Sequence, residues 1–138
     1  MIMEQTIRFI GKVQSKLKRI EDCPLQESEN APEAEIIIFP EFIEGIGDIK
    51  EGSEIILLTW LHQADRSTIK TQPRNDPNAS FIGVFSTRSP DRPNPIGMHV
   101  AKVISVNGNG LLKVSALEVL DQTPLIDIKP VWNRSFSV

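Results

Sequence analysis

The sequence is poor in cysteine and histidine: its 138 residues include one cysteine, Cys23, and two histidines, His62 and His99. A single cysteine excludes a disulfide within the chain, which fits the reducing cytoplasm, where we expect the protein to act. One thiol and two imidazoles without ligand-like spacing also form no recognisable zinc site. The sequence therefore predicts no bound metal.

Long apolar runs are missing as well. No stretch approaches the roughly 20 residues that cross a bilayer, and the N-terminus lacks the pattern of a signal peptide. The chain has no glycine-rich dinucleotide loop, P-loop or nucleophile elbow, which disfavours a Rossmann nucleotide fold. Hydrophobic residues make up 40% of the chain and charged residues 24%, as in ordinary globular proteins. We expect one domain over residues 1–138 and no membrane partner.

Charge is spread unevenly along the chain, although the net charge is only −3. Residues 21–54 contain eleven acidic residues and one basic residue, whereas residues 1–20 contain five basic residues and one acidic residue. A polyanion can dock on basic segments of an acidic protein, yet this chain lacks the strongly basic profile of a dedicated nucleic-acid binder. Charge alone therefore leaves an RNA partner undecided.

Short β-rich runs dominate the rest of the sequence. Six runs rich in Ile, Val, Leu, Thr and Phe predict strands at residues 6–13, 35–39, 54–61, 80–86, 98–106 and 111–120. The residues Asn107-Gly108-Asn109-Gly110 predict a hairpin turn, and one helical turn is expected at residues 41–46. Residues 15–32 and 63–79 are predicted to be long loops. The pattern indicates an all-β fold, a small β-barrel or sandwich of about six or more strands with little helix.

The most distinctive segment is residues 88–97, Arg-Ser-Pro-Asp-Arg-Pro-Asn-Pro-Ile-Gly. Its three prolines fix φ, remove backbone donors and push the preceding residues away from helix. A stiff, extended loop that presents Arg88, Arg92 and Asn94 is suited to an anionic or planar ligand. The alternative is an ordinary connector between strands with solvated arginines.

Two further groups of residues can carry chemistry. Glu118, Asp121 and Asp127 can accept ribose hydroxyls or an ammonium group, or pair with Arg88 or Arg92; the alternative is turn chemistry at residues 121–124. His62, at the end of a predicted strand, is a candidate general base, a hydrogen-bonding group or a structural residue. His99 alternates with apolar neighbours and is interpreted as structural or surface-exposed.

Residues 83–97 and 121–130 resemble the TsaA-like, or TrmO, family of S-adenosylmethionine-dependent tRNA (adenine-N6)-methyltransferases, with weaker similarity at residues 10–13, 23–26 and 57–62. The resemblance covers nearly the whole chain in the same order. It implies a small β-barrel that usually forms a homodimer and binds S-adenosylmethionine. Members methylate N6 of threonylcarbamoyl-adenosine next to the anticodon of tRNA.

The resemblance also implies site residues. Cofactor contacts are expected at Pro24, Leu25, Gln26, His62, Gln63, Arg88, Met98, Ser115, Ala116, Leu117 and Glu118. Arg88 is expected to bind the cofactor carboxylate, the backbone of residues 115–118 to bind the adenine edge, and His62 to serve as the candidate base. Contacts to tRNA or to the substrate pocket are expected at Arg66, Lys70, Arg74, Arg92, Asn94, Asp121 and Asp127.

The sequence departs from the family pattern in four ways. Leu25 stands where many members have Arg, Gln122 replaces the usual Gly, and Val131 stands where an aromatic residue commonly follows Lys-Pro. The chain is also expected to lack the C-terminal extension of longer members. These departures leave two alternatives open. One is a methyltransferase with another RNA or small-molecule acceptor, and the other is a non-catalytic module that binds S-adenosylmethionine or RNA.

Overall fold

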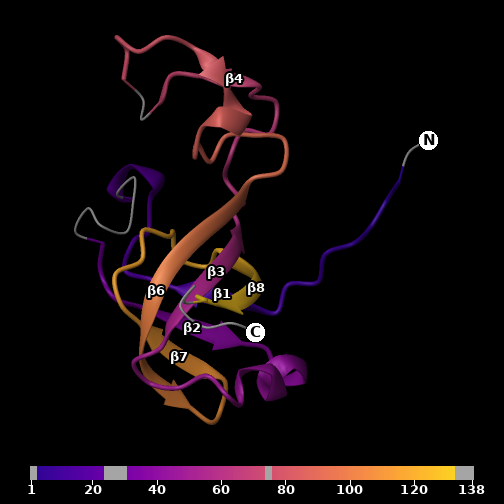
Figure 1. Cartoon of the computed structure of the whole chain (residues 1–138), viewed down its shortest axis with the longest axis vertical. Helices are drawn as coiled ribbons and strands as arrows, with labels where there is room; N and C mark the ends of the chain where they lie inside the picture. Colours follow the sequence, from indigo (N-terminus) through magenta and orange to yellow (C-terminus); the bar gives the residue numbers. More distant parts are fainter. Residues whose placement is uncertain (1–2, 24–30, 74–75, 133–138) are drawn as a thin grey trace.

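The computed structural model describes residues 3–23, 31–73 and 76–132, and most of its regular structure is β (Figure 1). The main sheet consists of β1 (Gly11–Gln14), β2 (Ala34–Ile38), β3 (Glu54–Trp60), β6 (Ile96–Asn107), β7 (Leu111–Val114) and β8 (Pro124–Pro130). A separate two-stranded sheet consists of β4 (Lys70–Thr71) and β5 (Ile82–Gly83). The 3-10 turns are η1 (Ile20–Asp22), η2 (Pro40–Ile46) and η4 (Val84–Ser86). The expectation of a mostly β chain with little helix is confirmed.

The main sheet is antiparallel, and its pairings close on themselves. The strand order is β1-β2-β7-β6-β3-β8, and β8 pairs again with β1. Each of the six strands therefore has two hydrogen-bonded neighbours, and none is left as an unpaired edge. Figure 1 shows the small β4–β5 sheet projecting beyond the place where β3 ends and β6 begins.

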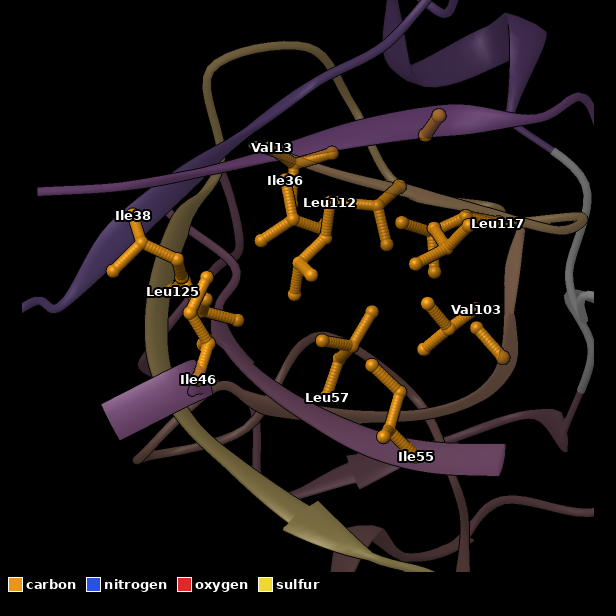
Figure 2. Close-up of a cluster of buried hydrophobic side chains, with 14 residues drawn as sticks. Val13, Ile36, Ile38, Ile46, Ile55, Leu57, Val103, Leu112, Leu117 and Leu125 are labelled. Atoms are coloured by element: carbon orange, nitrogen blue, oxygen red, sulfur yellow. The ribbon is translucent and has the colours of Figure 1, made fainter. Parts of the chain in front are cut away.

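The core fills the inside of this closed sheet. Alternate residues of β2 are buried, as expected for strands with one apolar face, and so are alternate residues of β6 from Gly97 to Val103. Figure 2 shows Val13, Ile36, Leu57, Leu112 and other side chains from different strands converging on one cluster. No helix in the described part of the chain is long and apolar enough to cross a membrane.

The predicted hairpin between β6 and β7 is present. Asn107 pairs with Leu111, the amide N–H of Gly110 donates to the Asn107 carbonyl oxygen at 3.1 Å, and Gly110 has a φ of +90°. A left-handed conformation of this kind is favourable for glycine, which has no Cβ. The helical turn predicted at residues 41–46 is also present, as η2.

Several predicted boundaries differ from the structure. The first strand starts at Gly11 and not at residue 6, and the run at residues 80–86 gives only β5 followed by η4. The predicted strand at residues 111–120 ends at Val114, although the amide N–H of Leu117 still donates to the carbonyl oxygen of Pro32, just before β2. The sequence did not predict β8. Its first residue is Pro124, and a strand tolerates proline there.

Candidate functional site

Two loops meet where β3 ends and β6 begins. Trp60 pairs with Ile96 in the β3–β6 register, and the amide N–H of Leu61 donates to the carbonyl oxygen of Pro95 at 2.8 Å. This pairing places the segment that follows β3, including His62 and Gln63, beside the proline-rich segment that precedes β6. The structure thus brings together two groups of residues that the sequence separates by about thirty positions.

Arg92 organises the proline-rich loop from within. Its guanidinium donates to the carbonyl oxygens of Val84, Thr87 and Ser89, at 2.6, 3.1 and 3.1 Å. Prolines contribute no N–H groups to a loop, so side-chain donors such as Arg92 supply hydrogen bonds that the backbone lacks. The Val84 carbonyl oxygen also accepts from the backbone N–H of Thr87 at 3.0 Å. Arg92 was predicted to belong to the pocket architecture or to contact the substrate, and in the structure its Nη1 and Nη2 groups hold the loop.

Arg66 ties the two loops together. It donates to the Pro93 carbonyl oxygen at 2.7 Å and to Asn94 Oδ1 at 3.2 Å, and it lies over the Trp60 ring, 5.0 Å from the centroid. A second link is the backbone N–H of Asp65, which donates to the Asp91 carboxylate at 2.8 Å. Arg66 and Asn94, both predicted as substrate contacts, therefore stabilise the junction of the loops.

Arg88 differs from the other two arginines. Its side chain is exposed, and within the part of the chain that the structure describes its guanidinium has no ion pair or hydrogen bond. His62 and Gln63 are exposed on the other loop, which follows β3, and Lys70 is exposed on β4. A loop held by Arg92 and Arg66 can keep the charge of Arg88 available for an anion, so less conformational entropy is lost on binding.

A buried chain of polar groups lies next to these loops. His99 Nδ1 donates to Glu118 Oε1, and His99 Nε2 lies 2.8 Å from Thr59 Oγ1. Thr59 is fully buried and His99 is 5% exposed, while the Glu118 side chain is 11% exposed. The second carboxylate oxygen of this side chain, Glu118 Oε2, is buried without a hydrogen-bond partner among the described residues.

Residues 115–118 reach His99 because they continue along β6 after β7 ends. The amide N–H of Ser115 donates to the Lys102 carbonyl oxygen and the amide N–H of Lys102 donates to Ser115 Oγ, both at 2.8 Å. Ala116 is half-buried, and the Leu117 side chain belongs to the core, as Figure 2 shows. Of residues 115–118, Glu118 has the side-chain oxygen, Oε2, that is left to accept a hydrogen bond from a ligand.

The segment before the predicted cofactor residues 24–26 comes close to this carboxylate. Burial raises the pKa of the Cys23 thiol, and the negative charges of Asp22, Glu118 and Glu21 raise it further. The charge of Glu118 thus acts electrostatically on the Cys23 thiol. Pro24, Leu25, Gln26 and Arg74, all predicted site residues, lie outside the described residues.

Asp121 anchors the first long loop. Its carboxylate accepts hydrogen bonds from the backbone N–H of Ser15 at 2.8 Å and from Lys18 Nζ at 2.9 Å. Burial raises the pKa of Asp121, but the hydrogen bonds from Lys18, Ser15 and Gln122 outweigh it, so the pKa lies below its usual range. Gln122 has a φ of 69°, a left-handed conformation that favours glycine, so the residue that replaces the family's Gly occupies a strained position.

Two predicted site residues point away from Glu118. Met98 alternates with buried His99 on β6 and is 46% exposed on the outer face of the sheet. Asp127 pairs in register with Leu58 on β3, as Met98 does, and its carboxylate accepts from the backbone N–H of Ile128 and pairs with Lys129. The side chains of Met98 and Glu118 thus lie on opposite faces of the sheet.

Sequence reasoning missed His99, Thr59 and Gly97 as members of the polar chain. Gly97 pairs with Thr59 in the β3–β6 register, and a Cβ on Gly97 would lie 2.5 Å from Thr59 Oγ1 and 2.6 Å from His99 Nε2. The signal was present in the alternation of Gly97, His99, Ala101 and Val103, which places a histidine on the buried face, where it needs partners. No group of three potential metal ligands occurs among residues 3–23, 31–73 and 76–132.

Comparison with known proteins gives consistent matches. The sequence matches the family model described as the tRNA-methyltransferase O N-terminal domain over residues 12–135. A "Probable S-adenosyl-L-methionine-binding protein" of Methanothermobacter thermautotrophicus is 39% identical over 130 residues, which cover 94% of this chain and 92% of that protein. An "S-adenosyl-L-methionine-binding protein" of Archaeoglobus fulgidus is 41% identical over 123 residues, which cover 89% of this chain and 86% of that protein.

A solved structure agrees with these sequence matches. The crystal structure of TrmO from Pseudomonas aeruginosa superimposes with a TM-score of 0.78 at 28% sequence identity. The match covers 99% of this chain and 60% of the other. This chain therefore spans about three fifths of the length of that TrmO chain.

Proposed function

Because the chain belongs to the TrmO family, whose N-terminal domain model matches residues 12–135, we propose that it is an S-adenosylmethionine-dependent methyltransferase. Its proposed acceptor is N6 of threonylcarbamoyl-adenosine next to the anticodon of tRNA. The observation that carries the proposal is the family match over nearly the whole chain. The names of the relatives, which describe S-adenosylmethionine-binding proteins, support the cofactor.

Residues of the two loops, together with Glu118 beside them, offer the groups that this cofactor needs. S-adenosylmethionine carries a carboxylate, which needs a cation, together with an ammonium group and ribose hydroxyls, which need acceptors. Arg88 is an exposed guanidinium on a loop that Arg92 and Arg66 hold, and Glu118 Oε2 is an acceptor without a donor among the described residues. A buried acceptor of this kind is costly unless a partner reaches it. We assign Arg88 to the cofactor carboxylate, and His62 and Gln63 to the same pocket.

When bound, S-adenosylmethionine supplies a methyl carbon that is activated by its sulfonium and transferred by in-line displacement. That displacement would leave one proton to be removed from N6. The chain's contribution is therefore to hold the two reactants in line and to accept the proton. His62 is the proposed acceptor because it is exposed at the end of β3, whereas both ring nitrogens of His99 are already engaged.

We further propose that the whole chain is a single domain built on a small β-barrel and that it works as a homodimer. The closed order of strand pairings supports the barrel. An apolar strip on the outer face of β3 and β6 supports the dimer, since apolar patches on a surface often mark interfaces. In this strip, Trp60 pairs with Ile96, Leu58 with Met98 and Ile56 with Val100. A dimer would cover Met98, which is 46% exposed in the single chain.

The proposal predicts methyl transfer that depends on the threonylcarbamoyl group. The protein is incubated with methyl-labelled S-adenosylmethionine and with matched tRNA that bears or lacks this group, and the digested nucleosides are identified by mass spectrometry. We expect label only in the threonylcarbamoyl-adenosine of the modified tRNA. Label on unmodified tRNA would point to another RNA acceptor, and cofactor binding without transfer to any tRNA would contradict the proposed acceptor.

A further inference from the structure

The buried chain Thr59–His99–Glu118 is unusual because a histidine inside the closed sheet has both ring nitrogens engaged. One nitrogen is bound to a fully buried hydroxyl and the other to a carboxylate. The order of groups, hydroxyl to imidazole to carboxylate, is that of a hydrolase triad. Thr59 is 0% exposed, however, whereas the Glu118 side chain is 11% exposed. Glu118 is therefore the end of these hydrogen bonds that lies nearer to solvent.

At that end, the two carboxylate oxygens of Glu118 have different environments. Oε1 accepts from His99, which fixes the plane and direction of the carboxylate, while Oε2 is buried without a partner among the described residues. A hydrogen bond to the oxygen that does not face the ligand commonly sets the orientation of a group that binds a ligand. Burying a carboxylate oxygen without a hydrogen-bond donor costs free energy. A hydrogen bond from a ligand to such an oxygen is therefore more favourable than the same bond in water.

The glycine that ends the proline-rich motif is required for this arrangement. Gly97 lies opposite Thr59 in the β3–β6 register, and the Thr59 hydroxyl and the His99 ring pass within 2.6 Å of where its Cβ would be. Any larger residue at position 97 would separate Thr59 from His99. The motif thus serves the site twice: its loop presents Arg88, and its last residue makes room for the Thr59–His99 hydrogen bond.

We propose that Thr59 and His99 are positioning residues, which hold the Glu118 carboxylate so that Oε2 accepts a hydrogen bond from the bound cofactor. This inference rests on the proposed function, because it takes S-adenosylmethionine as the ligand. The donor is a ribose hydroxyl or the ammonium group, both of which hydrogen-bond well to a carboxylate.

The test measures dissociation constants by calorimetry for three ligands. S-adenosylhomocysteine has both kinds of donor, methylthioadenosine lacks the ammonium group together with the carboxylate, and the 2′,3′-dideoxy analogue of S-adenosylhomocysteine lacks both ribose hydroxyls. The variants are His99→Leu, which removes both links, and His99→Asn, whose amide can still donate from near the position of Nδ1. Glu118→Gln and Thr59→Val change the polar atoms at nearly constant shape, and thermal unfolding shows which variants fold.

We expect His99→Leu and Glu118→Gln each to weaken S-adenosylhomocysteine binding by about tenfold or more, the usual effect of one hydrogen bond to a charged group. His99→Asn should recover most of that loss. Both losses should shrink to less than about threefold for the one analogue that lacks the contacted donor, because two changes in the same interaction are not additive. That analogue identifies the donor. If His99→Leu does not fold, the losses of affinity across the three ligands are compared for Glu118→Gln and Thr59→Val instead.

Two results would overturn the inference. Equal losses for all three ligands would mean that His99 and Glu118 matter only for folding, and unchanged affinity in Glu118→Gln would mean that Oε2 meets no donor. Failure of the proposed function is a separate result: the wild-type protein would then bind none of the three ligands.

Discussion

Replacing Arg88 with alanine is expected to weaken S-adenosylmethionine binding by about 10- to 100-fold, the usual range for a charge-assisted hydrogen bond to a carboxylate. Arg88 is exposed and makes no ion pair or hydrogen bond among the described residues, so its removal costs the fold little. The measurement is calorimetric titration with S-adenosylmethionine, with thermal unfolding of both proteins alongside. Arg88→Lys should recover part of the affinity, because a lysine keeps the charge but loses the planar fork.

The matched control is Lys102→Ala, which removes an exposed cation from β6 at a position paired with Glu54. This variant should bind the cofactor as the wild type does. Arg92→Ala should behave differently from Arg88→Ala, because it removes three hydrogen bonds to backbone carbonyls and so lowers the stability of the loop. Unchanged affinity in Arg88→Ala would contradict the assignment of Arg88 to the cofactor.

Gly97→Ala is expected to reduce the free energy of unfolding by about 1–3 kcal/mol, as overpacking of a well-packed interior usually does. The added Cβ would lie 2.5 Å from Thr59 Oγ1 and 2.6 Å from His99 Nε2, and these two atoms are themselves hydrogen-bonded to each other. Neither side chain can move away without breaking that bond inside the sheet. The measurement is urea unfolding followed by circular dichroism.

Gly83→Ala provides a matched control for this substitution. Gly83 has a φ of −62°, which any residue adopts, and a Cβ at this position meets nothing within 4 Å. We expect its free energy of unfolding to stay within about 0.5 kcal/mol of the wild-type value, as for most surface substitutions. If Gly97→Ala were as stable as Gly83→Ala, the close packing of Thr59 and His99 around Gly97 would be contradicted.

Much of the fold could be predicted from the sequence because local signals agree with the tertiary structure. The run at residues 54–61 becomes β3 with one residue fewer, and the Asn-Gly pattern after residue 106 becomes the β6–β7 hairpin. β8 could not be predicted, since its prolines at positions 124 and 130 are ordinary strand breakers in the sequence. Its place is set by pairing with β1 and β3, which no local pattern contains.

The candidate site was less predictable, because the sequence shows which residues are polar but not which atoms are already engaged. Arg88 and Arg92 look alike in the motif, yet Arg92 donates to three carbonyl oxygens and Arg88 to none of the described residues. His99 looked structural or surface-exposed, and it is buried with two polar partners. Its role depends on a register that brings Thr59 opposite Gly97.

These contacts give the proline-rich motif a divided role. Arg92 fixes the loop from within the motif, and Arg66 fixes it from outside through Asn94. Arg88 remains available for a ligand, and Gly97 leaves room for the Thr59–His99 hydrogen bond. Substitutions at Arg92 and at Arg88 therefore report on different properties, stability and affinity. A single affinity measurement on either arginine would not separate them.

The most direct test of this account locates the cofactor on the protein. Amide shifts of the 15N-labelled chain are followed by NMR during titration with S-adenosylmethionine, which suits a chain of 15.4 kDa. We expect saturable shifts concentrated at residues 61–63, 86–99 and 115–118, with little change in the hairpin at residues 106–111. Saturable shifts centred elsewhere, or none at all, would contradict it.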